Sequence, residues 1–166
     1  METTQSKDSR LDSLIILYDM QTPFFKSALE DITDKDAHNR LNTKVNHIAW
    51  LAGSLVAQRY ELANYLTTGN YKHRGSELFE NNQGIKDGIT YPSIEQYIED
   101  WNTISPIVRE ALINADTETL NKKIEIPGMD ITLFDLITFI IYREANHIGQ
   151  IALWRRLHGY DPMKYM

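Results

Sequence analysis

The chain has 166 residues, 42% hydrophobic content and a formal net charge of −6. This length supports one sizeable hydrophobic core, so we expect a single domain over residues 1–166. An acidic chain without a dense Lys/Arg cluster is not expected to bind nucleic acid, because duplex binding requires a basic face. The chain contains no cysteine, which excludes disulfides, thiolate metal ligands and a cysteine nucleophile, and which fits a reducing, cytoplasmic setting.

No membrane association is expected either. The N-terminal residues 1–8 are polar and acidic, unlike a signal peptide. The longest strongly apolar stretch, residues 136–142, is far shorter than the ~20 residues that a membrane span requires.

Two segments in the first half of the chain have helical periodicity. Apolar residues recur at three- and four-residue spacings over 8–32, where Pro23 predicts a kink. The second helix is predicted over 41–66, with Asn42 or Thr43 as its cap. Its many small residues allow a neighbouring helix to approach closely.

A long polar connection with several glycines follows, over residues 67–92. Connections of this length often carry the chain across a domain or contribute to function, and this one is interpreted as a crossover that also rims one end of a bundle. The third helix is predicted over 93–114. Ser93 and Gln96 have the spacing of a capping box at its start, and Pro106 predicts a second kink or a local break.

The last part of the chain is predicted to contain a turn and then the longest helix. Residues 124–130 are expected to form a loop with some extended character, in which Pro127 and Gly128 mark the turn. The fourth helix is predicted over 132–158, with a cap at its start and Gly159 as its stop. Together these elements predict an all-α fold, a four-helix bundle with a long crossover connection and less than about 5% strand.

Two polar residues interrupt an apolar face of the fourth helix. Arg143 and His147 lie one turn apart on a stripe that is otherwise formed by Leu136, Ile140, Ile151 and Trp154. Burial of an unpaired cation is costly, so either this face meets a polar cleft or Arg143 is paired inside the protein. Glu61 and Glu144 are the expected partners, with Glu61 preferred.

The second helix has a comparable polar stripe. His47, Ser54, Gln58 and Glu61 share one face with Leu51 and Tyr65, whereas Arg59 lies about a quarter turn away among apolar residues. If the polar stripe faces inward, it supplies polar groups opposite Arg143 and His147. If it faces outward, it is an ordinary solvated side of the helix, and the pattern alone leaves both possibilities open.

Two segments resemble signatures of the DinB/YfiT-like superfamily. Residues 143–151, Arg-Glu-Ala-Asn-His-Ile-Gly-Gln-Ile, resemble its last-helix motif, in which a His-x-x-x-His pair precedes Gly-Gln. Residues 46–55 resemble its second-helix segment, in which a His follows a glycine. The resemblance implies a four-helix bundle with an unusual crossover topology, often dimeric, and a three-His site for nickel, zinc or iron. Some members are S-transferases or isomerases that use low-molecular-weight thiols.

The chain departs from this pattern at two of the three ligand positions. Ser54 and Arg143 stand where the family has histidines, so His147 is the only metal ligand that the resemblance carries over. A guanidinium has no lone pair for a metal and repels a cation. His47 lies two turns before Ser54, about 10 Å along the helix, too far to replace the lost ligand. We therefore expect no cofactor; if one binds, it is a divalent metal (Ni, Zn or Fe).

Three functional hypotheses follow. The preferred one is a metal-free family member that binds a small polar or anionic ligand in the cleft. The second is a metal-dependent thiol S-transferase or hydrolase with a reduced ligand set. The third is a homodimeric interaction protein without catalysis, although a homodimer is compatible with all three. The candidate ligand-binding residues are Arg143, His147, Ser54, Gln58, Glu61 and His47.

Overall fold

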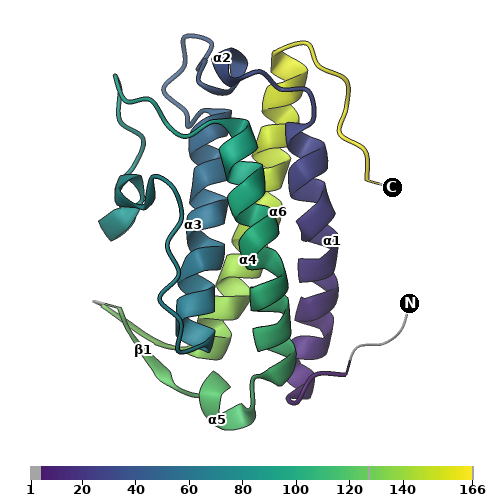
Figure 1. The fold of residues 1–166 in the computed structure, drawn as a ribbon, viewed down its shortest axis with the longest axis vertical. Helices are drawn as coiled ribbons and strands as arrows, with labels where there is room; N and C mark the ends of the chain where they lie inside the picture. Colours follow the sequence, from purple (N-terminus) through teal and green to yellow (C-terminus); the bar gives the residue numbers. More distant parts are fainter. Residues whose placement is uncertain (1–4, 127, 166) are drawn as a thin grey trace.

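The computed structural model describes residues 5–126 and 128–165, and most of these residues are helical. Figure 1 shows long helices side by side around one core: α1 (Asp12–Leu29), α3 (Ile48–Leu66), α4 (Ile94–Asn114) and α6 (Leu133–Leu157). Shorter elements lie at the two ends of this group: the helices α2 (Asp34–Ala37) and α5 (Thr117–Leu120) and the strands β1 (Lys123–Ile126) and β2 (Met129–Thr132). The predicted all-α class is thus confirmed to the extent that the described chain is mostly helical, with one small two-stranded sheet.

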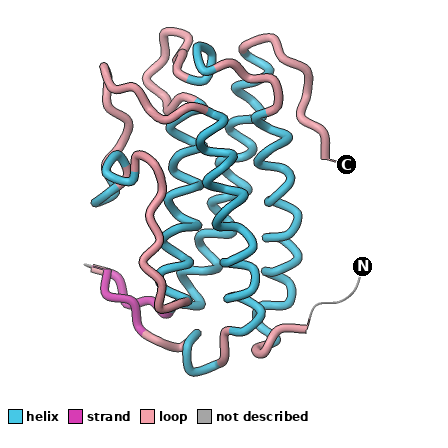
Figure 2. Tube along the Cα trace, in the orientation of Figure 1, coloured by secondary structure: helices cyan, strands magenta, loops and turns pink. Residues whose placement is uncertain are grey.

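The connection between α3 and α4 runs the full length of the molecule. Figure 1 shows that α3 and α4 point in the same direction, so the chain must return from the end of one to the start of the other. It does so over residues 67–93 along the outside of α3, mostly as irregular chain with short 3₁₀ turns at Ser76–Leu78 and Glu80–Asn82 (Figure 2). The crossover that the sequence predicts is therefore present.

The helix predicted from residue 41 begins only at Ile48, so its first seven predicted residues are not helical. Leu41 and Asn42 have left-handed backbone angles, with φ of 46° and 61°. The Arg40 side chain donates hydrogen bonds to the carbonyls of Lys44 and Val45 and holds this segment as a loop. The predicted caps, Asn42 and Thr43, were consequently wrong.

The first helix is also shorter than the predicted range of residues 8–32. A 3₁₀ turn covers Ser9–Leu11, the α-helix ends at Leu29, and Asp31 has a φ of 63° that a continuing helix does not allow. Pro23 and Pro106 both lie inside helices that continue past them. A local break at Pro106 is therefore excluded.

The segment predicted as a loop over 124–130 forms an antiparallel hairpin. Strand β1 pairs with β2 in the register Ile124 to Ile131 and Ile126 to Met129. Ile124 is buried, and this burial anchors the hairpin against the helices. Gly128 has a φ of 80° in the turn, and the predicted contribution of Pro127 lies outside the described residues.

The predicted starts of α4 and α6 are confirmed, since both carry complete capping boxes. At α4, the Ser93 hydroxyl accepts from the Gln96 N–H, and the Gln96 side chain accepts from the Ser93 N–H. Thr132 and Asp135 make the same pair of bonds at α6. Each box satisfies two N–H groups that a helix start would otherwise leave unpaired. In the described part of the chain, no helix is long and apolar enough to cross a membrane.

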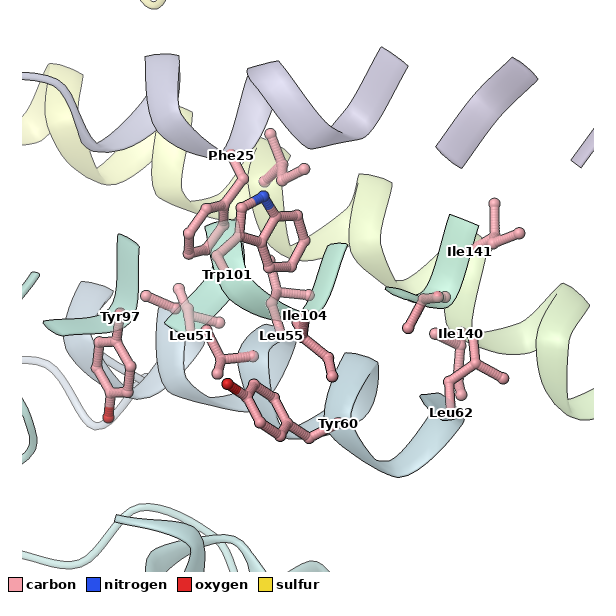
Figure 3. Packing of buried hydrophobic residues seen from close by; sticks show 14 of the residues in the cluster. Phe25, Leu51, Leu55, Tyr60, Leu62, Tyr97, Trp101, Ile104, Ile140 and Ile141 are labelled. Carbon is pink, nitrogen blue, oxygen red and sulfur yellow. The ribbon is translucent and has the colours of Figure 1, made fainter. Parts of the chain in front are cut away.

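The core is rich in aromatic rings as well as aliphatic side chains. Figure 3 shows Trp101 and Phe25 stacked between the helices, with ring centroids 4.1 Å apart and planes at 23°. Leu51, Leu55 and Ile104 pack around them and are fully buried. This apolar packing joins α1, α3 and α4.

The guanidinium of Arg59 lies within this core. Arg59 is 0% exposed and donates from Nε and Nη2 to the two carboxylate oxygens of Glu144, at 2.7 and 2.9 Å. Its plane lies between the rings of Tyr18 and Trp101, whose centroids are 3.9 and 3.5 Å from the guanidinium carbon. The charge is therefore both paired with a carboxylate and stacked between aromatic faces.

Two hydroxyl residues complete this cluster, one from α1 and one from α4. Arg59 Nη1 donates to Thr22 Oγ1 at 2.9 Å and to Ser105 Oγ at 2.7 Å. The backbone carbonyl of Thr22 accepts from Trp101 Nε1, and that of Ser105 accepts from the Tyr18 hydroxyl. Side chains from all of the long helices thus meet at one buried charge.

Candidate functional site

Arg143 lies on α6 and reaches toward α3. Its Nη2 donates to Ser54 Oγ at 3.3 Å, so the structure brings together two of the positions singled out by the sequence. The side chain is half-buried, and this burial lowers the pKa of the guanidinium from its ordinary value, opposed by the charge of Glu61. Arg143 is therefore a partly desolvated cation with a neutral hydrogen-bond partner.

The expected ion-pair partners of Arg143 take other roles. Glu144 pairs with Arg59 in the core, because it projects from α6 about 100° away from Arg143, so this part of the prediction was wrong. Glu61 is exposed, and among the described residues it forms no ion pair within 4.0 Å. Desolvation raises the pKa of its carboxyl group, and the more distant charge of Arg143 opposes this shift.

His147 lies one turn after Arg143 and is only 7% exposed. Neither ring nitrogen has a hydrogen-bond partner among the described residues. Burial, assisted by the nearby charge of Arg143, lowers the pKa of His147 to about 4. The imidazole is therefore neutral near pH 7 and presents one N–H donor and one lone pair.

Two further buried side chains next to this region have unpaired polar atoms. The Trp50 ring stacks on His147 with centroids 6.2 Å apart, and its Nε1–H has no acceptor among the described residues. Gln58, one turn after Ser54 on α3, likewise has an unpaired Oε1. Buried polar groups are normally hydrogen-bonded, so these atoms can pair with a ligand or with water.

His47 does not join this group. It is the N-cap of α3, where its Nδ1 accepts from the Trp50 backbone N–H at 3.0 Å. Its ring lies against those of His38 and Tyr91, at centroid distances of 5.2 Å in both cases. Burial lowers the pKa of His47 to about 4, so the ring remains a neutral acceptor that stabilises the helix start.

The residues present do not fit a three-His metal site. Ser54, Arg143 and His147 together provide one imidazole, one weakly coordinating hydroxyl and a cation without a lone pair. Within residues 5–126 and 128–165, no group of three or more His, Cys, Asp or Glu side chains is arranged to hold a metal ion. The chemistry of this donor set suits an anion or a hydrogen-bonding ligand instead.

Sequence reasoning missed Trp50 as part of this region and Arg59 as the partner of Glu144. Trp50 is buried, and its residue type alone did not distinguish it from an ordinary core tryptophan. The signal for Arg59 was its place among apolar residues on α3, because a cation on an apolar stripe requires a buried partner. The carboxylate partner, Glu61 or Glu144, was predicted for Arg143 instead.

Comparison with models of known protein families finds no match for this chain, and comparison with curated proteins finds none either. The resemblance to the DinB/YfiT-like superfamily therefore rests on the sequence of residues 46–55 and 143–151.

Proposed function

We propose that the chain is a DinB-like four-helix-bundle protein in which a ligand-binding site for a small anion has replaced the three-His metal site. The observation that carries this proposal is the 3.3 Å contact between Arg143 and Ser54, two positions where the family has histidines, beside His147 at the third. The parallel arrangement of α3 and α4, joined by the long crossover, supports the family topology (Figure 1).

The charge and hydrogen-bonding state of this site favour an anion. A guanidinium has five N–H donors, and the bond to Ser54 uses one of them. Its partial burial makes an anionic partner favourable, because no carboxylate in the described chain pairs with it directly. The unpaired Trp50 Nε1–H and the neutral His147 supply further donors close by. A small carboxylate or a phosphate matches this donor set.

Replacement of Arg143 with methionine is expected to change the free energy of unfolding by less than about 1 kcal/mol, because Arg143 is half-buried and has no close ion pair. The same change is expected to abolish binding of acetate and inorganic phosphate, measured by calorimetry or by amide chemical shifts. The Glu61→Gln variant is the control, since loss of a nearby negative charge leaves anion binding unchanged or tighter. Anion binding that survives in Arg143→Met, or loss of several kcal/mol of stability, contradicts the proposal.

A second candidate function, homodimerisation, is favoured by an exposed apolar face. On the adjacent helices α1 and α6, several large apolar side chains are about half exposed or more: Ile16, Met20, Phe139, Tyr142, Leu153 and Leu157. Large exposed apolar side chains gathered on adjacent helices are typical of protein interfaces. We therefore propose that two copies associate through α1 and α6.

The dimer is tested by the solution mass of the protein at micromolar concentration. We expect the wild type to have the mass of a dimer, and the double variant Phe139→Asp/Leu153→Asp to have that of a folded monomer, because two charges in an apolar interface are costly to desolvate. A matched pair of changes at exposed polar positions of α4, outside the proposed face, Asn102→Asp and Thr103→Asp, should leave the mass unchanged. A monomeric wild type contradicts the assignment of this face.

A further inference from the structure

A cavity of about 510 Å³ lies between α3 and the crossover segment, separate from the contact of Arg143 with Ser54. Its floor is formed by residues of α3, including Tyr60, Glu61 and Tyr65, and its other wall by crossover residues that include Tyr71, His73 and Phe79. The volume is in the range of sites for small molecules.

The lining combines a carboxylate with a group of aromatic rings. The rings of Tyr60 and His73 are 5.2 Å apart, and those of His73 and Phe79 are 6.2 Å apart, so they form a continuous aromatic wall. Burial lowers the pKa of His73, which keeps this ring uncharged near neutral pH. Glu61 has no ion-pair partner within 4.0 Å among the described residues.

The other charged side chains of the lining offset each other. Lys72 and Glu80 both line the cavity, and both are exposed to solvent. Their opposite charges leave the carboxylate of Glu61 as the excess charge facing the aromatic wall. A cation in the cavity would therefore be attracted by a carboxylate and by ring faces at the same time.

The walls of the cavity are fastened to the rest of the fold. The Asn64 side chain donates to the Tyr71 carbonyl at 3.1 Å and accepts from the Tyr71 N–H at 2.8 Å. Further along, the Arg74 N–H donates to the Asp100 carboxylate at 3.0 Å. Phe79 packs directly on Gly53, where a Cβ would lie only 2.4 Å from the ring. The aromatic wall is thus held in place before any ligand arrives, which lowers the entropic cost of binding.

From these observations we propose that the cavity between α3 and the crossover binds a small organic cation, with its ammonium group facing Glu61 and its alkyl groups against the rings of Tyr60, Tyr71 and Phe79. This proposal is independent of the anion site at Arg143. A second cavity of about 600 Å³, between the end of α3 and α4, provides a comparison, because Glu110 lines it but no aromatic residue does. Without a ring face, that cavity lacks the cation–π attraction.

The test uses tetramethylammonium as the probe and tert-butanol as its uncharged counterpart of similar shape, each titrated into the full-length protein with detection by amide chemical shifts. We expect saturable shifts at residues 57–82 with tetramethylammonium and none with tert-butanol. The Glu61→Gln variant should bind the cation at least about tenfold more weakly, because the contact with the charged carboxylate is lost. The Tyr65→Ala variant removes an exposed ring of the lining and should also weaken binding of the cation, so it provides the test if Glu61→Gln alters folding.

The Glu110→Gln variant is the matched control and should bind the probe as the wild type does. Arg143→Met, which removes a cation near Glu61, should bind tetramethylammonium equally well or more tightly. This result separates the cavity from the anion site, since the same variant is expected to lose anion binding. Equal shifts with the cation and the alcohol, or unchanged affinity in both Glu61→Gln and Tyr65→Ala, would overturn the proposal.

Discussion

Replacement of Arg59 with methionine is expected to lower the free energy of unfolding by about 3–5 kcal/mol, because it leaves a fully buried carboxylate without its partner. The loss has several parts in this protein. Glu144 is 0% exposed and loses both of its bonds to Arg59. The hydroxyls of Thr22 and Ser105 lose their charged donor as well. Chemical denaturation followed by circular dichroism measures the change.

Two further variants separate the buried charge from other effects. In Arg59→Met/Glu144→Leu both charges are removed, and most of the lost stability should return, since no ion is then left unpaired. In Arg109→Met the change disrupts an ion pair with Asp19 that is more than a third exposed, and the expected loss is about 1 kcal/mol or less. A loss in Arg59→Met no larger than in Arg109→Met would contradict the assigned role of this arginine.

The double change Ser54→His/Arg143→His is expected to convert a protein that purifies with well under one equivalent of divalent metal into one that binds zinc or nickel stoichiometrically. The side chains at positions 54 and 143 already meet, and His147 offers a neutral ring whose nitrogens are unpaired in the described structure. Three imidazoles then face one another, a donor set that suits divalent transition metals. Elemental analysis after dialysis measures the metal content.

The single variant Arg143→Leu is the control for this experiment, because it removes the repelling cation without adding a lone pair. We expect it to bind no more metal than the wild type. If the wild type itself retains stoichiometric metal, or if the double variant does not acquire it while remaining folded, the site does not correspond to the three-His position of the family.

Short sequence motifs predicted the starts of the two helices that are capped by residues of their own first turn. The capping boxes at Ser93 and Thr132 place α4 and α6 to within a residue, because their bonds are formed by neighbours in the sequence. The start of α3 could not be obtained in this way. It depends on Arg40, which bonds to the following loop and to Asp87 from the distant crossover, and a periodicity argument over residues 41–47 does not include such contacts.

For the polar residues of the candidate site, too, the features set by neighbours in the sequence were predicted and the features set by distant contacts were not. Helical periodicity placed Arg143 and His147 on one face of a helix, and this follows from geometry that is local. The choice of partners depends on how α3 and α6 rotate about their own axes when they pack. A rotation by one residue position exchanges Glu144 for Arg143 as the residue that faces the core, which is why Arg59 was not identified as the buried partner.

The contacts around Arg59 give α1 and α4 an internal pseudo-twofold symmetry. Each helix carries an aromatic residue, then a hydroxyl residue four positions later, then proline: Tyr18, Thr22 and Pro23 in α1, and Trp101, Ser105 and Pro106 in α4. The two helices are antiparallel (Figure 1), and each aromatic side chain donates to the carbonyl that precedes the proline of the other helix. Sliding one helix past the other by a single turn, about 5.4 Å, would break both of these bonds together. The pair therefore has one permitted register, and α1 and α4 are expected to move as a single rigid body.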